Sequence, residues 1–171
     1  MLKIEHVDVL FLESDTPRQK KDREHIAGLN LCKEMISKYF GEENPEFSVN
    51  DFGKPYVNKD GIFFNISHSK GRVACAVSDT PVGLDIEKVT EKNDTDIKNF
   101  AKRYFVENEI KQLEEANYSS LAFYKIWTKK EAYSKMLGSA LSRNLKIDTT
   151  ELDIDTYVEG EYIFSVAINK I

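Results

Sequence analysis

Two long helical patterns, each with a start signal and a stop signal, constrain the fold of this chain most. The first begins after a Ser-Asp-Thr-Pro segment at residues 14–17 and ends at residue 40, before Gly41. The second runs from residue 119 or 120 to residue 137, with Gly138 as its stop signal. Because strand-like runs flank both helices, the sequence predicts an α+β fold.

The order of the predicted elements divides the chain into two similar halves. A strand, the first long helix and further strands occupy residues 1–80. A strand, a helix over 94–115 with a break near 105–108, the second long helix and further strands occupy residues 81–171. The predicted strands cover residues 2–12, 47–50, 62–69, 72–78, 81–88, 145–147, 152–158 and 162–168, and those at 72–78 and 81–88 are expected to be neighbours.

Composition favours a globular protein and weighs against broad nucleic-acid binding. Of the 171 residues, 41% are hydrophobic and 31% are charged, and the formal net charge is -5. Nucleic-acid binding generally needs a basic surface. Cys32 and Cys75 lack a CxxC partner, which indicates buried thiols in a reducing compartment. The chain shows neither a signal peptide nor an apolar run of about 18 residues, so we expect a cytoplasmic protein without a membrane span.

The second long helix carries an unusual polar row. Trp127, Glu131 and Lys135 are four residues apart, so they share one helix face, with Tyr124 and Thr128 beside them. The stripe around a tryptophan is normally apolar. Either this face is exposed and Glu131 and Lys135 form an ordinary ion pair, or the face lines a polar site.

Two carboxylates on a predicted strand point to a metal site. Asp85 and Glu87 are two residues apart and share a face, whereas Leu84 and Ile86 point to the core. Carboxylates this close repel each other unless a cation lies between them, and Mg²⁺ prefers such oxygen ligands. Glu131 could complete the set. The alternative is an ordinary Asp-x-Glu pair on a half-exposed strand.

Four motifs occur together in the order and spacing of a known family. The segments 53–55 (Gly-Lys-Pro), 65–69 (Asn-Ile-Ser-His-Ser), 82–87 (Val-Gly-Leu-Asp-Ile-Glu) and 127–135 (Trp-Thr-Lys-Lys-Glu-Ala-Tyr-Ser-Lys) resemble those of the 4′-phosphopantetheinyl transferases. The tryptophan in the last motif and the two-halved length are similar to the surfactin-synthetase-type subclass. The resemblance covers residues 53–147 well and the rest of the chain loosely.

The resemblance implies an enzyme that transfers 4′-phosphopantetheine from coenzyme A to a serine of an apo acyl or peptidyl carrier protein and releases 3′,5′-ADP. Asp85, Glu87 and Glu131 match the family's ligands for Mg²⁺, with Mn²⁺ as the other candidate ion. Glu131 also matches the base for the serine hydroxyl, and Lys135 matches the lysine that neutralises the pyrophosphate. Asp85, Glu131 and Lys135 are therefore the candidate catalytic residues.

The resemblance also implies the contacts to coenzyme A. Ser67 and His68 match such contacts, with His68 near the 3′-phosphate, and Lys54 matches the loop beside the adenine. Arg23 is the nearest match to an arginine of the first helix that holds the 3′-phosphate, but it is one residue out of register. Glu109 falls where the family carries a further acid and is expected to support the site.

For the whole chain, the resemblance implies a pseudo-dimer of two α+β halves, each a small antiparallel sheet packed by a long helix. The active site and coenzyme A would lie in the cleft between the halves, and the protein would be a monomer.

Two other functions remain open from the residues. Asp85, Glu87 and a lysine such as Lys88 could form the core of a Mg²⁺-dependent nuclease, although the acidic balance argues against it. A coenzyme A or carrier-protein binding module without enzymatic activity would use the same acids structurally.

Overall fold

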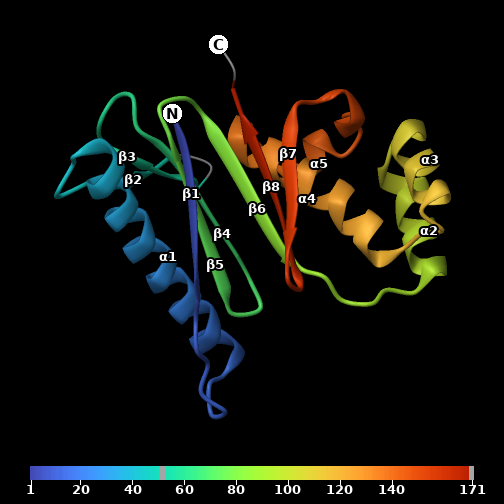
Figure 1. The fold of residues 1–171 in the computed structure, drawn as a ribbon, viewed down its shortest axis with the longest axis horizontal. Coiled ribbons are helices and arrows are strands. Elements are labelled where there is room, and N and C mark those ends of the chain that lie inside the picture. The colour runs from blue at the N-terminus through green and yellow to red at the C-terminus, as the bar shows by residue number, and fades with distance from the viewer. Residues whose placement is uncertain (51–52, 170–171) are drawn as a thin grey trace.

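Small antiparallel sheets and two long helices form the fold in the computed structural model, which describes residues 1–50 and 53–169 (Figure 1). The mixed α+β fold expected from the sequence is confirmed. Asp51 and Phe52, just before the Gly-Lys-Pro segment, lie outside the described residues. Within the described ranges, no helix is both long enough and apolar enough to cross a membrane.

The N-terminal sheet has the strand order β1-β5-β4, and α1 covers one of its faces (Figure 1). Strand β5 alternates: Cys75 and Val77 join the core under α1, whereas Ala74 and Ala76 pack toward the C-terminal sheet. Both cysteines are free and buried, as predicted. The bounds are β1 Leu2–Asp8, α1 Pro17–Phe40, β4 Phe63–Ser69 and β5 Arg72–Ser78, and a separate hairpin pairs β2 Phe47–Val49 with β3 Pro55–Val57.

The C-terminal sheet has the order β6-β8-β7, and α4 packs along β6 and β8. Strands β7 and β8, both predicted as strands, form a hairpin, and the helix expected over 94–115 is broken into two as predicted. The bounds are β6 Val82–Lys88, α2 Asp94–Tyr104, α3 Glu107–Glu115, α4 Ser120–Leu137, α5 Leu141–Asn144, a 3₁₀ turn Thr149–Glu151, β7 Ile154–Glu159 and β8 Tyr162–Ile168.

Local signals placed the ends of the long helices correctly. Thr16 caps α1, accepting a hydrogen bond from the backbone N–H of Gln19, and Ser119 caps α4. Gly41 and Gly138 end the two helices in the left-handed conformation, with φ of 69° and 64°. Such a backbone strains most other residues, so the glycines fix where each helix stops.

Three details of the sequence prediction were wrong. Residues 145–147 are not a strand: this segment follows α5, and the ammonium of Lys130 holds the Ile147 carbonyl at 2.7 Å. The first strand ends at Asp8 instead of Leu12, whose backbone N–H bonds the carboxylate of Asp15. The strands at 72–78 and 81–88, expected to be neighbours, do not pair with each other, since β5 lies between β1 and β4 and β6 pairs with β8.

The junction between the sheets lies where β6 runs beside β4. The chain passes from β5 directly to β6, yet β6 pairs with β8 instead of β5. Side chains of β4 take the place of a backbone ladder along β6: Asn65, Ser67 and Ser69 accept hydrogen bonds from the N–H groups of Leu84, Ile86 and Lys88. This seam brings the carboxylates of β6 next to the polar tip of β4.

Candidate active site

The expected acids converge on one pocket of about 260 Å³ between β4, β6 and α4. The close approach of α4 to β6 depends on Gly83: a Cβ at this position would lie 1.9 Å from the carbonyl oxygen of Ala132. The helix backbone therefore rests directly on the strand, and the side chains on either side of this contact meet those of β6. The pocket is lined by Ile66, Ser67, His68, Asp85, Glu87, Glu131 and Lys135.

Asp85 is the buried centre of this group, with only 4% of its surface exposed. Its Oδ1 accepts hydrogen bonds from Lys135 Nζ at 2.7 Å and from Ser67 Oγ at 3.0 Å. Its Oδ2 is buried and has no hydrogen-bond partner among the described residues. Burial raises the pKa of Asp85, and the attraction of Lys135 offsets this only in part. The unpaired oxygen therefore leaves room for a further positive charge.

Glu87 and Glu131 complete a cluster of carboxylates whose ionisation is costly. Ser69 Oγ donates to Glu87 Oε2 at 2.8 Å. Burial raises the pKa of Glu87, and burial together with the charge of Asp85 raises the pKa of Glu131. All three groups would be stabilised in the ionised form by a cation placed among them.

The cluster fits a divalent cation chemically but is not assembled around one. Over residues 1–50 and 53–169, no three histidine, cysteine or carboxylate side chains are arranged to hold a metal ion. In this arrangement the ammonium of Lys135 neutralises Asp85. The donor set is nevertheless made of the hard oxygens that Mg²⁺ prefers, and the buried Asp85 Oδ2 still lacks a partner.

The polar row of α4 divides between the core and the site. Trp127 packs against Phe100 and Phe123 in the aromatic core under α2 and α3. Lys135 forms an ion pair with Asp85. It therefore does not form the surface ion pair with Glu131 that the spacing of four residues allowed. Of the two interpretations of this row, the one that placed it in a polar site holds for Glu131 and Lys135.

Asn65 and Ser69 belong to the site although the sequence analysis did not select them. Both flank Ser67 at a spacing of two, so all three side chains lie on the edge of β4 that faces β6. The signal that could have identified them is the alternation of polar residues along this strand, which matches the spacing of two between the N–H groups of Leu84, Ile86 and Lys88.

Lys54 lies beside the site, at the end of α4. Its Nζ donates to the carbonyl oxygen of Lys135 at 2.5 Å, and burial lowers the pKa of Lys54. This carbonyl group also accepts from the backbone N–H of Gly138 at 3.2 Å, so Lys54 adds a second bond at the end of the helix. A second pocket, of about 340 Å³, begins here and shares Lys135 with the first; it is lined by Gly53, Lys54, Pro55, Asn65, Ser134, Lys135, Gly138, Ser139 and Ala140.

His68 and Arg23 have different surroundings, although both were expected to meet the same phosphate. His68 lines the first pocket, and its Nδ1 lies 2.8 Å from Glu24 Oε2. Arg23 is held instead by the buried Asp15, at 2.9 Å from its Nε. The guanidinium is therefore engaged away from the carboxylate cluster, and a buried acid occupies the neighbouring position of the helix.

Glu109 lies in the core and not in the carboxylate cluster. Its carboxylate is fully buried and forms an ion pair with the equally buried Lys130 at 2.7 Å. The backbone and hydroxyl of Thr149 and the backbone of Val106 also donate to it. Glu109 therefore joins α3, α4 and the 3₁₀ turn, so the supporting role expected of it concerns the fold.

Replacing Lys130 with methionine should destabilise the protein by about 3–5 kcal/mol, because the charge of Glu109 would remain buried without its partner. The melting temperature should fall by at least about 6 °C. Thermal unfolding of Lys130→Met beside the double variant Lys130→Met/Glu109→Leu measures this. The double variant should regain much of the loss, and equal losses in both would show that packing alone is responsible.

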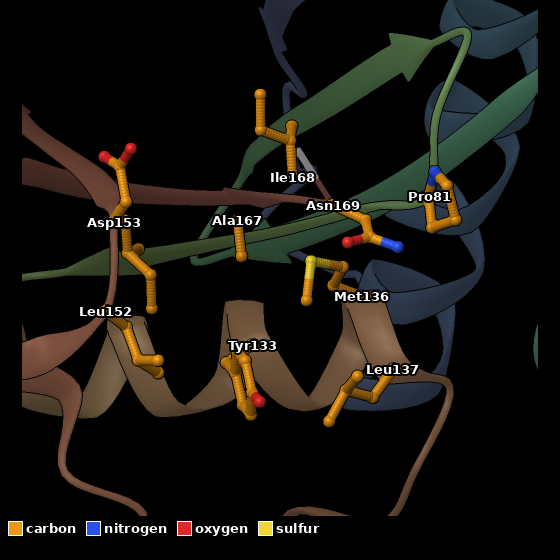
Figure 2. Close-up of a pocket in the computed structure, with 10 residues that line it drawn as sticks. Pro81, Tyr133, Met136, Leu137, Leu152, Asp153, Ala167, Ile168 and Asn169 are labelled. Carbon is orange, nitrogen blue, oxygen red and sulfur yellow. The ribbon is translucent and has the colours of Figure 1, made fainter. Parts of the chain in front are cut away.

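A larger pocket, of about 510 Å³, lies on another face of α4 (Figure 2). It is lined mainly by apolar side chains, and Tyr133, Met136 and Leu137 contribute to this lining from the helix, as labelled in Figure 2. Asp153 is the charged residue of its lining. A phosphate-bearing ligand needs positive charge, so the smaller pocket with Lys135 is the better candidate site.

Comparison with known proteins matches part of the chain to one family. The family model of the 4′-phosphopantetheinyl transferase superfamily matches residues 81–166. This range contains Asp85, Glu87, Glu131 and Lys135, whereas Lys54, Ser67 and His68 precede it.

Individual relatives agree with the family match. The chain is 45% identical over 101 residues to the 4′-phosphopantetheinyl transferase gsp of Aneurinibacillus migulanus, covering 58% of this chain and 40% of that protein. It is 34% identical over 145 residues to Sfp of Bacillus subtilis (80% and 61%). It is 31% identical over 143 residues to AcpT of Salmonella typhimurium (81% and 71%). The matched part of the chain thus spans 40% of the length of gsp and 61% of the length of Sfp.

Proposed function

The chain belongs to the 4′-phosphopantetheinyl transferase superfamily, and from this premise we propose that it modifies carrier proteins. It would transfer the 4′-phosphopantetheine group of coenzyme A to a serine of an apo acyl or peptidyl carrier protein and release 3′,5′-ADP. The observation that carries this proposal is the convergence of Asp85, Glu87, Glu131 and Lys135 on one pocket.

Asp85, Glu87 and Glu131 would hold Mg²⁺, or Mn²⁺, between β6 and α4. The unpaired Oδ2 of Asp85 and the raised pKa values of all three carboxyl groups support this assignment. A bound divalent ion would supply positive charge where negative charge builds on the phosphate oxygens.

Glu131 is the proposed base for the reaction. The serine oxygen would form a bond to the phosphorus that carries pantetheine, while the bond from this phosphorus to the oxygen of 3′,5′-ADP breaks and the electron pair leaves with ADP. Glu131 would accept the serine proton, directly or through water. Lys135 would stabilise the charge on the departing pyrophosphate oxygens from the rim of the same pocket.

The donor would lie along the seam between β4 and β6. Ser67 and His68 line the carboxylate pocket and would contact its phosphates, with the 3′-phosphate near His68. The second pocket, beside Lys54, would take the adenine. Arg23 would have to leave Asp15 to reach a phosphate, so we assign the 3′-phosphate to His68 first.

The remaining expectations extend this proposal to the whole chain. Residues 1–80 and 81–171 would be two related α+β halves of a monomer that acts in the cytoplasm, with coenzyme A between the halves. A nuclease is less well supported, since Lys88, the lysine expected for its core, pairs with Glu161 at 3.0 Å.

Intact mass spectrometry of an apo acyl carrier protein tests the function. Incubation with the chain, coenzyme A and Mg²⁺ should add one phosphopantetheine, and EDTA should prevent the gain. The Lys135→Met variant should slow transfer by about 10²–10³-fold, the range found when one group that stabilises developing charge is removed. A carrier that stays unmodified while coenzyme A binds would favour the non-enzymatic binding module.

A further inference from the structure

A buried carboxylate on α1 holds the histidine of the candidate site. Glu24 is 7% exposed, and its Oε2 lies 2.8 Å from Nδ1 of His68. Its Oε1 accepts the backbone N–H of Gly71 at 2.7 Å, in the turn that joins β4 to β5. One carboxylate therefore fixes both the imidazole and the backbone turn that follows it.

The packing of α1 on β4 dictates this contact. A Cβ on Gly28 would lie 2.7 Å from the Cγ2 of Ile66, so the helix and the strand approach closely at this point. Glu24 is one helical turn before Gly28, and His68 is two residues after Ile66 on the same face of β4. The contact between Glu24 and His68 therefore follows from the way the helix lies on the strand.

Engaging Nδ1 leaves Nε2 as the ring nitrogen that can meet a ligand. The side chain of His68 is 36% exposed and lines the pocket with Lys135, whereas Glu24 is almost completely covered. A carboxylate on one ring nitrogen fixes the orientation of the ring, so the other nitrogen is held in place to meet a ligand.

We propose that Glu24 is a positioning residue for His68 and thereby sets the preference of the chain for a donor with a 3′-phosphate. This proposal rests on the proposed function, since it assigns that phosphate to His68. Arg23, the neighbouring cation on α1, is paired with Asp15 and does not take this role in the structure. Glu24 acts on the ligand only through the imidazole.

The negative charge of Glu24 opposes a phosphate, but it would lie farther from that phosphate than the ring nitrogen of His68. A phosphate oxygen on Nε2 would lie about 3 Å from that nitrogen and roughly 7 Å from the carboxylate across the ring. Since Coulomb energy falls with distance, the repulsion would be less than half of that from a carboxylate at the position of Nε2. We therefore expect the orientation of His68, and not repulsion by Glu24, to decide whether Glu24 strengthens or weakens phosphate binding.

Calorimetric titration with coenzyme A and with 3′-dephospho-coenzyme A, in the presence of Mg²⁺, tests the proposal without requiring transfer. The measured quantity is the ratio of the two dissociation constants. The wild type should prefer coenzyme A, and Glu24→Gln should reduce this preference about three- to tenfold, which is the worth of one hydrogen bond. If the amide oxygen of a glutamine keeps the bond from Gly71, its other terminal atom is an N–H donor and no longer an acceptor for Nδ1 of His68.

Two further variants separate positioning from a structural role. In a His68→Ala background, Glu24→Gln should leave the ratio unchanged, since the residue through which Glu24 acts is gone. Glu34→Gln, an exposed carboxylate on the same helix, should leave the ratio of the wild type unchanged. If Glu24→Gln fails to fold, Glu24→Asp, which keeps the charge but shortens the reach, should lower the ratio instead.

The outcomes distinguish this proposal from the function on which it rests. A wild type that binds neither donor would overturn both. A wild type that binds coenzyme A, together with a Glu24→Gln variant of unchanged ratio, would overturn the role of Glu24 alone. A ratio that rises in Glu24→Gln would also overturn it, because repulsion by the carboxylate would then be the larger effect.

Discussion

Replacing Glu131 with glutamine should abolish most of the transfer activity and, at the same time, stabilise the metal-free protein. Loss of a general base typically slows a reaction about 10²–10⁴-fold. The gain in stability follows because burial and the charge of Asp85 raise the pKa of Glu131 in the folded protein. Glutamine has nearly the same shape without that charge.

The sign of the stability effect follows from proton binding. A carboxyl group whose pKa is higher in the folded state than in the unfolded state keeps its proton longer when folded. The stability of the wild type therefore falls as the pH rises from the unfolded pKa through the folded pKa. Above the folded pKa this cost is fully present, and Glu131→Gln removes it. At a pH below both values the two proteins should differ little.

Thermal unfolding in EDTA, at neutral and at acidic pH, measures the effect. We expect the melting temperature of Glu131→Gln to rise by about 2–4 °C at neutral pH, which corresponds to about 1 kcal/mol in a domain of this size. Glu115→Gln, an exposed carboxylate on α3, should show no such rise. Full transfer activity in Glu131→Gln, or a lower melting temperature at neutral pH, would contradict this role.

Replacing Gly83 with alanine should destabilise the protein and disrupt the site together. The new Cβ would lie 1.9 Å from the carbonyl oxygen of Ala132 and 2.3 Å from the backbone nitrogen of Met136. Both atoms belong to the backbone of α4, so no side-chain rotation can relieve the clash, and the helix must move away from β6. Overpacking of this kind costs about 1–3 kcal/mol, and a backbone clash lies at the upper end.

The shift would also separate Glu131 and Lys135 from Asp85. A displacement of about 1 Å at reacting groups can slow catalysis about 10²-fold. We therefore expect Gly83→Ala to lower the melting temperature by about 6–12 °C and to lose most of its activity even where it is folded. Circular dichroism and the carrier-protein mass assay measure the two effects on one preparation.

Gly28→Ala is the matched comparison for Gly83→Ala. Its Cβ would meet side-chain methyl groups of Ile66 and Val73 instead of backbone. Alanine also favours the helix by about 1 kcal/mol relative to glycine, so the net loss should be smaller. If Gly83→Ala were as stable as the wild type, the close contact of α4 with β6 would not be what positions the site.

Local sequence signals predicted the elements because such signals act over a few residues. Thr16 and Gly41 set the ends of α1, and Leu84 and Ile86 face the core while Asp85 faces the site, as the alternation indicated. The same locality explains the strand wrongly predicted at 145–147. The carbonyl group of Ile147 in this segment bonds Lys130, a residue of another element, and local signals do not reveal such a partner.

The sequence by itself determined the α+β elements, the four motifs and the shared face of Asp85 and Glu87. Only the tertiary structure decided the partners: Lys135 bonds Asp85, Glu109 bonds Lys130, and Glu24 bonds His68. Backbone propensities and helix caps depend on residues that are neighbours in the sequence, so the sequence alone reveals them. Partners that lie tens of residues apart depend on how helices rest on strands, which is fixed by close contacts such as that at Gly83.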